Sequence, residues 1–214
     1  MTVSVAVVDY GAGNLRSIRR ALEAAGADVT ITSDAREIRS ADAVVLPGVG
    51  AAGAAMDRLR QLDLVPVLGE VVDASRPFLG ICLGMQLLFG HQEEGDTRGL
   101  DLLPGRVHSL RPEVKVPQIG WNQVRWVRDA VGYQTAEEGE FYFVHSFVAE
   151  PDDPANVVAI TNYGGVFPSI VRHGQVWGTQ FHPEKSGPAG LRMVAGWVES
   201  VRNATPAALE SVPA

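Results

Sequence analysis

The sequence lacks three features that would each assign it to a class of protein. It has a single cysteine, Cys82, among 214 residues, so it can form no intrachain disulfide and fits a reducing cytoplasm. No apolar run approaches the length of a bilayer-spanning helix, and the first nine residues lack the basic segment of a signal peptide. The formal charge of −7 argues against a surface for nucleic acid or anionic membrane. We therefore expect a cytoplasmic protein with no nucleic-acid or membrane partner.

The amino-terminal half alternates apolar runs of strand length with segments of helical periodicity. A hydrophobic content of 46% and a charged content of 20% are those of an ordinary globular protein. Strands are expected at 3–8, 28–32 and 43–46, and helices at 15–25, 34–39, 51–61 and 64–74. Because strands that alternate with helices form right-handed βαβ units, the sheet should be mostly parallel and flanked by helices.

Strands predominate in the second half of the chain. They are expected at 105–110, 122–127, 140–149, 157–163, 166–171 and 175–181, and a helix over about 189–202 follows them. The predicted class is α/β, with a mostly parallel central sheet and additional antiparallel strands in the C-terminal half. Since no linker divides the chain, we expect one domain over 1–202 and a flexible tail over 203–214.

The stretch around Cys82 carries the clearest chemical pattern. A short apolar segment from Phe78 predicts a buried strand, and a helix is expected directly after the cysteine. Gly80 and Gly84 complete the G-x-nucleophile-x-G pattern of a nucleophile elbow, a turn so sharp that a side chain at either glycine would collide with backbone. The alternative is that Cys82 is a small buried hydrophobic residue, as free cysteines usually are. The elbow pattern by itself leaves both interpretations open.

A second glycine-rich turn, Gly11-Ala12-Gly13, follows the first predicted strand and invites a dinucleotide-binding interpretation. That fingerprint requires a third small residue where this chain has Arg16, whose long side chain would obstruct close packing of helix on strand. We therefore favour a tight turn between strand and helix, and expect no cofactor.

A cysteine nucleophile needs a base and a group that orients the base. Of the five histidines, His182 closes a predicted strand, and Glu184 two places later shares its face in an extended backbone. We expect Glu184 to orient the imidazole of His182. The backbone N–H groups of Leu83, directly after the nucleophile, and of Val49, in a turn after the third strand, are candidates for an oxyanion hole. The turn at Val49 can also be a plain glycine-rich connection.

These residues resemble a known family. Gly80-Ile81-Cys82-Leu83-Gly84-Met85-Gln86 together with His182-Pro183-Glu184 is similar to the class I (triad) glutamine amidotransferases, and the likeness extends to about Arg202. Four further stretches resemble the subfamily of glutaminase subunits of imidazole glycerol phosphate synthases: Asp9–Asn14, Pro117–Asn122, Tyr142–Ser146 and Lys185-Ser186. The resemblance implies a flavodoxin-like α/β fold and a glutaminase with no cofactor and no metal.

The resemblance also implies a role for each residue of the site. Cys82 would attack the side-chain amide of glutamine, His182 would protonate the departing ammonia, and Glu184 would hold His182. The residues expected to bind the substrate glutamine are Gly50, Gln86, Glu94, Ser146 and Phe147. For Glu94, a solvated loop carboxylate is the alternative.

A partner follows from the same resemblance. The ammonia acceptor in the subfamily is a separate cyclase subunit with a (β/α)₈ barrel, a fold of about 250 residues that 214 residues cannot also contain. The resemblance indicates a heterodimer with the cyclase, and Asn14, Trp121, Tyr142 and Lys185 are the candidates for its interface. A place in the core is the alternative for Trp121.

Three functional hypotheses remain open at this point. The first is a glutaminase that serves a cyclase or another ammonia acceptor. The second is a free-standing cysteine hydrolase of the same fold, which would turn over fully without a partner. The third is a non-catalytic module in which Cys82 is only redox-sensitive.

Overall fold

A nine-stranded sheet forms the centre of the protein in the computed structural model, which describes residues 2–128 and 139–209. In spatial order its strands are β2 (Ala27–Thr32), β1 (Val3–Val8), β3 (Ala43–Gly48), β4 (Phe78–Cys82), β13 (Val176–Thr179), β12 (Val166–His173), β11 (Val157–Asn162), β8 (Gln118–Trp126) and β9 (Gly139–His145). The first five strands are mutually parallel and the remaining pairs are antiparallel. The predicted α/β class is confirmed, and the parallel strands follow the order of flavodoxin-like folds.

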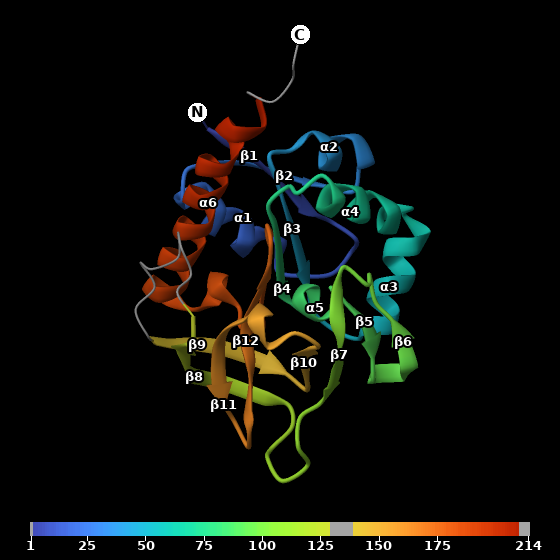
Figure 1. Ribbon diagram of the computed structural model, residues 1–214, viewed down its shortest axis with the longest axis vertical. Coiled ribbons are helices and arrows are strands. Elements are labelled where there is room, and N and C mark those ends of the chain that lie inside the picture. Colours follow the sequence, from blue (N-terminus) through green and yellow to red (C-terminus); the bar gives the residue numbers. More distant parts are fainter. Residues whose placement is uncertain (1, 129–138, 210–214) are drawn as a thin grey trace.

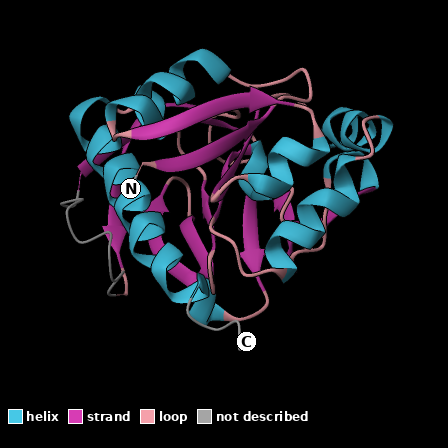
Figure 2. Cartoon of the chain, turned by 90° about the horizontal axis from the view of Figure 1, so that it is seen from above, coloured by secondary structure: helices cyan, strands magenta, loops and turns pink. Residues whose placement is uncertain are grey.

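Helices cover both faces of the parallel strands (Figure 2). They are α1 (Leu15–Ala24) and α6 (Gly187–Leu209) on one face, and α2 (Ala35–Ser40), α3 (Ala52–Gln61) and α4 (Leu64–Asp73) on the other. Val7 of β1 belongs to the core that contains Trp197 of α6, whereas its neighbour Val8 belongs to the core that contains Met56 of α3. Both faces of β1 are therefore buried, which explains why its sequence is continuously apolar.

A smaller four-stranded sheet lies beside the central one (Figure 1). Its strands, in order, are β10 (Phe147–Pro151), β7 (Leu103–Ser109), β5 (Phe89–Gln92) and β6 (Thr97–Arg98). The expected single strand over 140–149 was wrong, because the chain passes from β9 in the central sheet to β10 in the small sheet. Strands β5 and β6 were also not predicted. Single turns of 3-10 helix occur at η1 (Glu94–Asp96), η2 (Pro154–Asn156) and η3 (Pro183–Lys185).

Local hydrogen bonds account for the break between β9 and β10. The imidazole Nδ1 of His145 lies 2.9 Å from the carbonyl oxygen of Phe147, and the N–H of Leu110 donates to the carbonyl of Ser146 over 2.8 Å. Gln118 of β8 is the last partner of β9, and Ser109 of β7 is the first partner of β10. Ser146 therefore stands at the point where the chain leaves one ladder and joins the other.

The helix after the elbow, α5 (Leu83–Gln86), ends after one turn. The buried side chain of Gln92 donates to the carbonyl oxygens of Gln86, over 2.8 Å, and of Phe89, over 3.0 Å. These bonds satisfy carbonyls that a longer helix would use internally, so a side chain from the following strand ends the helix.

The closing helix α6 continues to Leu209, beyond the predicted end near Arg202. Alanines at positions 204, 207 and 208 favour this extension, because alanine has the highest helix propensity. Of the predicted tail, residues 210–214 lie outside the described residues. No helix within the described ranges is both long and apolar enough to cross a membrane.

Candidate active site

Cys82 sits at the carboxyl end of β4 in a strained backbone conformation, with φ 55° and ψ −111°. A Cβ on Gly80 would lie 2.7 Å from the carbonyl oxygen of Gly84, and a Cβ on Gly84 only 1.9 Å from that of Leu46. Both contacts are with backbone and cannot relax cheaply. The predicted nucleophile elbow is therefore the local structure here, and its glycines are required for space.

His182 reaches the elbow from β13, the parallel neighbour of β4, although it lies 100 positions later in the sequence. Its imidazole Nδ1 is 2.9 Å from Oε1 of Glu184, and both side chains are at most 2% exposed. The backbone holds the histidine in place: its N–H donates to the carbonyl of Tyr142, and its carbonyl accepts from the hydroxyl of Ser186. The predicted His182–Glu184 pair is thus present and is shielded from solvent.

The electrostatics of this pair favour a charged imidazole. Burial opposes the charge of His182, but the interactions with Cys82 and Glu184 outweigh it and raise the pKa of the imidazole to about 9. The second nitrogen, Nε2, is buried and has no hydrogen-bond partner among the described residues. A proton on Nε2 therefore has the sulfur of Cys82 as its main electrostatic partner, which is the pairing that an imidazolium–thiolate nucleophile needs.

A cavity of about 400 Å³ opens directly over the sulfur. It brings together every residue predicted for the substrate and for the oxyanion hole. Its lining consists of Val49, Gly50, Cys82, Leu83, Gln86, Glu94, Pro117, Val144, His145, Ser146, Phe147 and Lys185.

Gln86 and Glu94, both predicted to contact glutamine, are held by backbone groups. The Nε2 of Gln86 donates to the carbonyl of Phe147 over 2.8 Å. Oε2 of Glu94 accepts from the N–H of Ala52, the first residue of α3, over 2.7 Å. Glu94 is therefore not simply a solvated loop acid, because the start of a helix fixes its position in the cavity wall.

The end of β3 is held in place, whereas the turn that follows it is open to solvent. The hydroxyl of Tyr10 donates to the carbonyl of Pro47 over 2.9 Å, and a Cβ on Gly48 would lie 2.7 Å from that hydroxyl. Val49, by contrast, is 42% exposed, and Gly50 has φ +92° with no atom near its Cβ direction. Gly48 is thus required for space and Gly50 for its backbone conformation.

Three of the four predicted interface residues lie together at the mouth of the site. Trp121 is 52% exposed, so it is not a core residue, and its ring meets the ring of Tyr142 edge-on at 6.0 Å. The Nζ of Lys185 lies 5.9 Å from the centroid of the same tyrosine ring. Asn14 stands apart from these three, as the residue before α1 at the carboxyl end of β1.

Sequence reasoning missed two residues that the fold brings to the site, Gln180 and Tyr10. Gln180 is fully buried and contacts both Gln86 and Cys82. Tyr10 holds the turn after β3, and burial followed by the charge of Cys82 raises the pKa of its hydroxyl well above the usual range. Gln180 lies two residues before His182, but β13 ends at Thr179 and the chain bends at Gln180 and Phe181, so the period of a strand does not identify it.

Within the part of the chain that the structure describes, His145 in the cavity wall has a hydrogen-bond partner for only one of its ring nitrogens. Its Nδ1 is bonded to Phe147, but Nε2 is buried without a hydrogen-bond partner among the described residues. Burial lowers the pKa of His145 to about 4, with a further contribution from the charge of His182. The ring is therefore neutral at pH 7 in a wall of the cavity.

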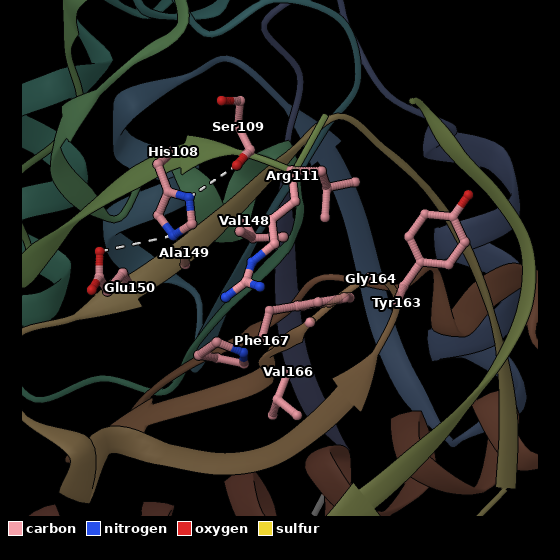
Figure 3. A pocket seen from close by; sticks show the side chains of 13 residues that line it. His108, Ser109, Arg111, Val148, Ala149, Glu150, Tyr163, Gly164, Val166 and Phe167 are labelled. Carbon is pink, nitrogen blue, oxygen red and sulfur yellow. Dashed lines mark hydrogen bonds and ion pairs between the residues drawn. The ribbon is translucent and has the colours of Figure 1, made fainter. Parts of the chain in front are cut away.

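A second cavity of about 300 Å³ lies between β7, β10 and the hairpin of β11 and β12 (Figure 3). Its polar side chains include His108, whose Nε2 is 3.8 Å from Oε2 of Glu150, and Arg111. It shares no lining residue with the cavity at Cys82.

Comparisons with known proteins agree with this geometry. The model of the family "Glutamine amidotransferase class-I" matches residues 6–199. Relatives named imidazole glycerol phosphate synthase subunit HisH share 49% identity, one from Halobacterium salinarum over 92% of this chain and 93% of its own, another from Methanothermobacter thermautotrophicus over 92% and 99%. A crystal structure of a glutamine amidotransferase superposes with a TM-score of 0.74 at 18% identity, covering 92% of this chain and 98% of that one, which supports the fold. The chain belongs to the class I glutamine amidotransferase family.

Proposed function

We propose that the chain is the glutaminase subunit of an imidazole glycerol phosphate synthase and works in the cytoplasm as one domain over residues 1–202. The observation that carries this proposal is the strained Cys82 beside the buried His182–Glu184 pair, in a chain 49% identical to relatives of that name. The substrate is glutamine, and the products are glutamate and ammonia.

The reaction proceeds in two steps. The thiolate of Cys82 attacks the carbon of the glutamine carboxamide, while N–H groups of Leu83 and Val49 bind the oxyanion. The C–N bond breaks as the imidazolium of His182 gives its proton to the nitrogen, so ammonia leaves and a γ-glutamyl thioester remains. His182 then takes a proton from water, whose oxygen attacks the thioester carbon and breaks the C–S bond. Glutamate leaves, and the thiolate and imidazolium are restored.

The buried carboxylate of Glu184 supports both steps. It accepts from Nδ1 of His182, which fixes the ring so that Nε2 faces the reacting atoms. Gly50, Gln86, Glu94, Ser146 and Phe147 line the cavity and position the amino-acid end of glutamine.

The ammonia must pass to its acceptor before it is protonated and stops being a nucleophile. We propose a heterodimer with a cyclase (β/α)₈ barrel, docked on the exposed Trp121 and Lys185 and the half-buried Tyr142 beside the cavity, with Asn14 at the same edge of the sheet. Exposed aromatic residues with a nearby cation are common in protein interfaces. The peptide at Val49 follows Gly48, which is closely packed beside the hydroxyl of Tyr10. A change in the orientation of this peptide is the proposed switch by which an acceptor-loaded partner activates glutaminase.

The test is glutamate release by the purified chain, alone and with a cyclase subunit and its nucleotide ligand. Cys82→Ala should abolish synthesis from glutamine in the complex but leave synthesis from added ammonia, since only the first needs the thiol. His182→Asn should behave in the same way, and His108→Asn, on β7 outside the cavity, is the matched control that should keep full activity. Loss of both syntheses in a well-folded Cys82→Ala complex would contradict the proposal.

The same measurements separate the other hypotheses. Full turnover without any partner would favour a free-standing hydrolase, and activation by a different acceptor enzyme would favour another ammonia-dependent synthase. Equal glutaminase rates with and without an acceptor-loaded partner would refute the switch at Val49.

A further inference from the structure

The side chain of Gln180 is completely buried behind the active site and connects two of its residues. Its Oε1 lies 3.0 Å from Nε2 of Gln86, and its Nε2 lies 3.8 Å from Sγ of Cys82. The backbone N–H of Gln180 donates to the carbonyl oxygen of Ser169 over 2.9 Å, so the backbone of Gln180 is also held by β12. The amide therefore bridges the substrate-binding wall and the nucleophile.

The orientation of both amides follows from one carbonyl. The oxygen and nitrogen of a glutamine side chain are assigned from their partners, and a backbone carbonyl can only accept. Because Gln86 contacts the carbonyl of Phe147, the atom that it presents there must be its NH₂ group. The same NH₂ faces Gln180, so Gln180 must present its oxygen in return. Its own NH₂ is then left to face the sulfur of Cys82.

Besides the imidazole of His182, the sulfur has two polar neighbours with opposite preferences. The carbonyl of Val144, 3.7 Å away, can accept only from the protonated thiol. The NH₂ of Gln180 can donate to the sulfur and so favours the thiolate, the form that attacks.

We propose that Gln180 is a positioning residue of the glutaminase reaction, which transmits the orientation fixed at Phe147 through Gln86 to the thiolate of Cys82. This inference rests on the proposed function, which it deepens. A buried amide is costly unless it is hydrogen-bonded, and both side-chain partners of Gln180 belong to the active site. An apolar side chain of the same length would fill the space without that requirement.

The test measures the alkylation rate of Cys82 by iodoacetamide from pH 5 to pH 10. Because the chain has one cysteine, the signal reports this thiol alone and requires neither partner nor glutamine. Gln180→Met keeps the length but removes the donor, so the rate at pH 7 should fall about tenfold and the midpoint of the pH curve should rise, as expected for loss of a hydrogen bond to a charged group. Thiol chemistry and glutaminase activity are read separately, so a chain that lacks glutaminase activity but shows this shift would refute only the proposed function.

A second variant tests whether the orientation of Gln86 reaches Cys82 through Gln180. It also replaces the first variant if Gln180→Met does not fold. Gln86→Met removes the donor that orients Gln180, so the pH curve should move in the same direction although no hydrogen bond joins Gln86 to the sulfur. The double variant should add little to either single change, because the two amides act in series. Thr161→Val, which removes another buried hydrogen bond, to Gln123 on β8, should leave the curve unchanged. Curves for both amide variants that superimpose on the parent, or shifts that simply add, would overturn the proposal.

Discussion

Replacing Glu184 by glutamine tests the electrostatic core of the site. The substitution keeps the shape of the side chain but removes the charge that lies 2.9 Å from Nδ1 of His182. Since the interactions with Cys82 and Glu184 raise the pKa of the imidazole to about 9, loss of one of them should lower that value towards the ordinary 6.5. The pair is almost fully buried, so solvent does not screen the effect.

The size of the effect follows from the shift that a single close opposite charge produces, about one to three pKa units. Each unit corresponds to about 1.4 kcal/mol, and a glutamine can still form a neutral hydrogen bond, so we expect about 2 kcal/mol of lost stability. The sign is fixed by linkage. A histidine whose folded pKa is raised stabilises the protein fully below pH 6.5 and loses that contribution as pH rises through about 9. The difference in the free energy of unfolding between the parent and Glu184→Gln should therefore be largest at pH 6 and smallest near pH 9.5.

Urea unfolding at several pH values and NMR titration of the His182 ring measure the two quantities independently. The matched control is Glu70→Gln, which removes the exposed ion pair with Arg39 and should leave the pH dependence between 6 and 9.5 unchanged, because neither partner titrates there. If the pKa of His182 is the same in parent and Glu184→Gln, or the stability gap does not depend on pH, the assignment of Glu184 as the partner that charges the imidazole is wrong.

Two further predictions concern the backbone around the nucleophile. Gly84→Ala should prevent formation of the native elbow, because its Cβ would lie 1.9 Å from the carbonyl oxygen of Leu46. Gly50→Ala should cost only the strain of a positive φ, about 1–2 kcal/mol. Thermal unfolding of the two proteins measures the difference, and equal melting temperatures would contradict the prediction. Tyr10→Phe removes the hydroxyl bonded to the buried carbonyl of Pro47 and should lower the free energy of unfolding, measured with urea, by about 1–3 kcal/mol. In the complex, kcat should fall while the KM for glutamine stays unchanged. A changed KM with an unchanged kcat would assign Tyr10 to substrate binding instead.

The parallel half of the fold was predictable because its signals are local. Strand β1 was predicted with its observed limits, since a strand buried on both faces is continuously apolar. The Gly80, Gly84 and Cys82 pattern identified the elbow because only glycine fits there. The pairing of His182 with Glu184 was predicted from the period of an extended chain; the contact is present, but Glu184 lies in the 3-10 helix η3, so the extended backbone assumed for it was wrong.

What could not be predicted depends on contacts between distant segments. The end of α5 depends on the amide of Gln92, which lies six positions after Gln86 and contacts it only because the chain turns back into β5. The run over 140–149 was predicted as one strand, because the contact that divides it at Ser146 comes from the N–H of Leu110, directly after β7 of the other sheet. Gln180 likewise acquires its role only from two partners that are 94 and 98 positions away.

The functional residues lie where the backbone is irregular, and there is a physical reason for this. The interior of a regular strand or helix uses its N–H and C=O groups in backbone hydrogen bonds, so it has none to offer a substrate. The cavity is built where the backbone leaves regular structure: at Cys82 with its positive φ, at Gly50 with φ +92°, and at Ser146 between two sheets. Such conformations persist only when their surroundings over-determine them. Here the lack of space between Gly84 and the carbonyl of Leu46 does so, which makes one glycine necessary both for the stability of the elbow and for the position of Cys82 in the cavity wall.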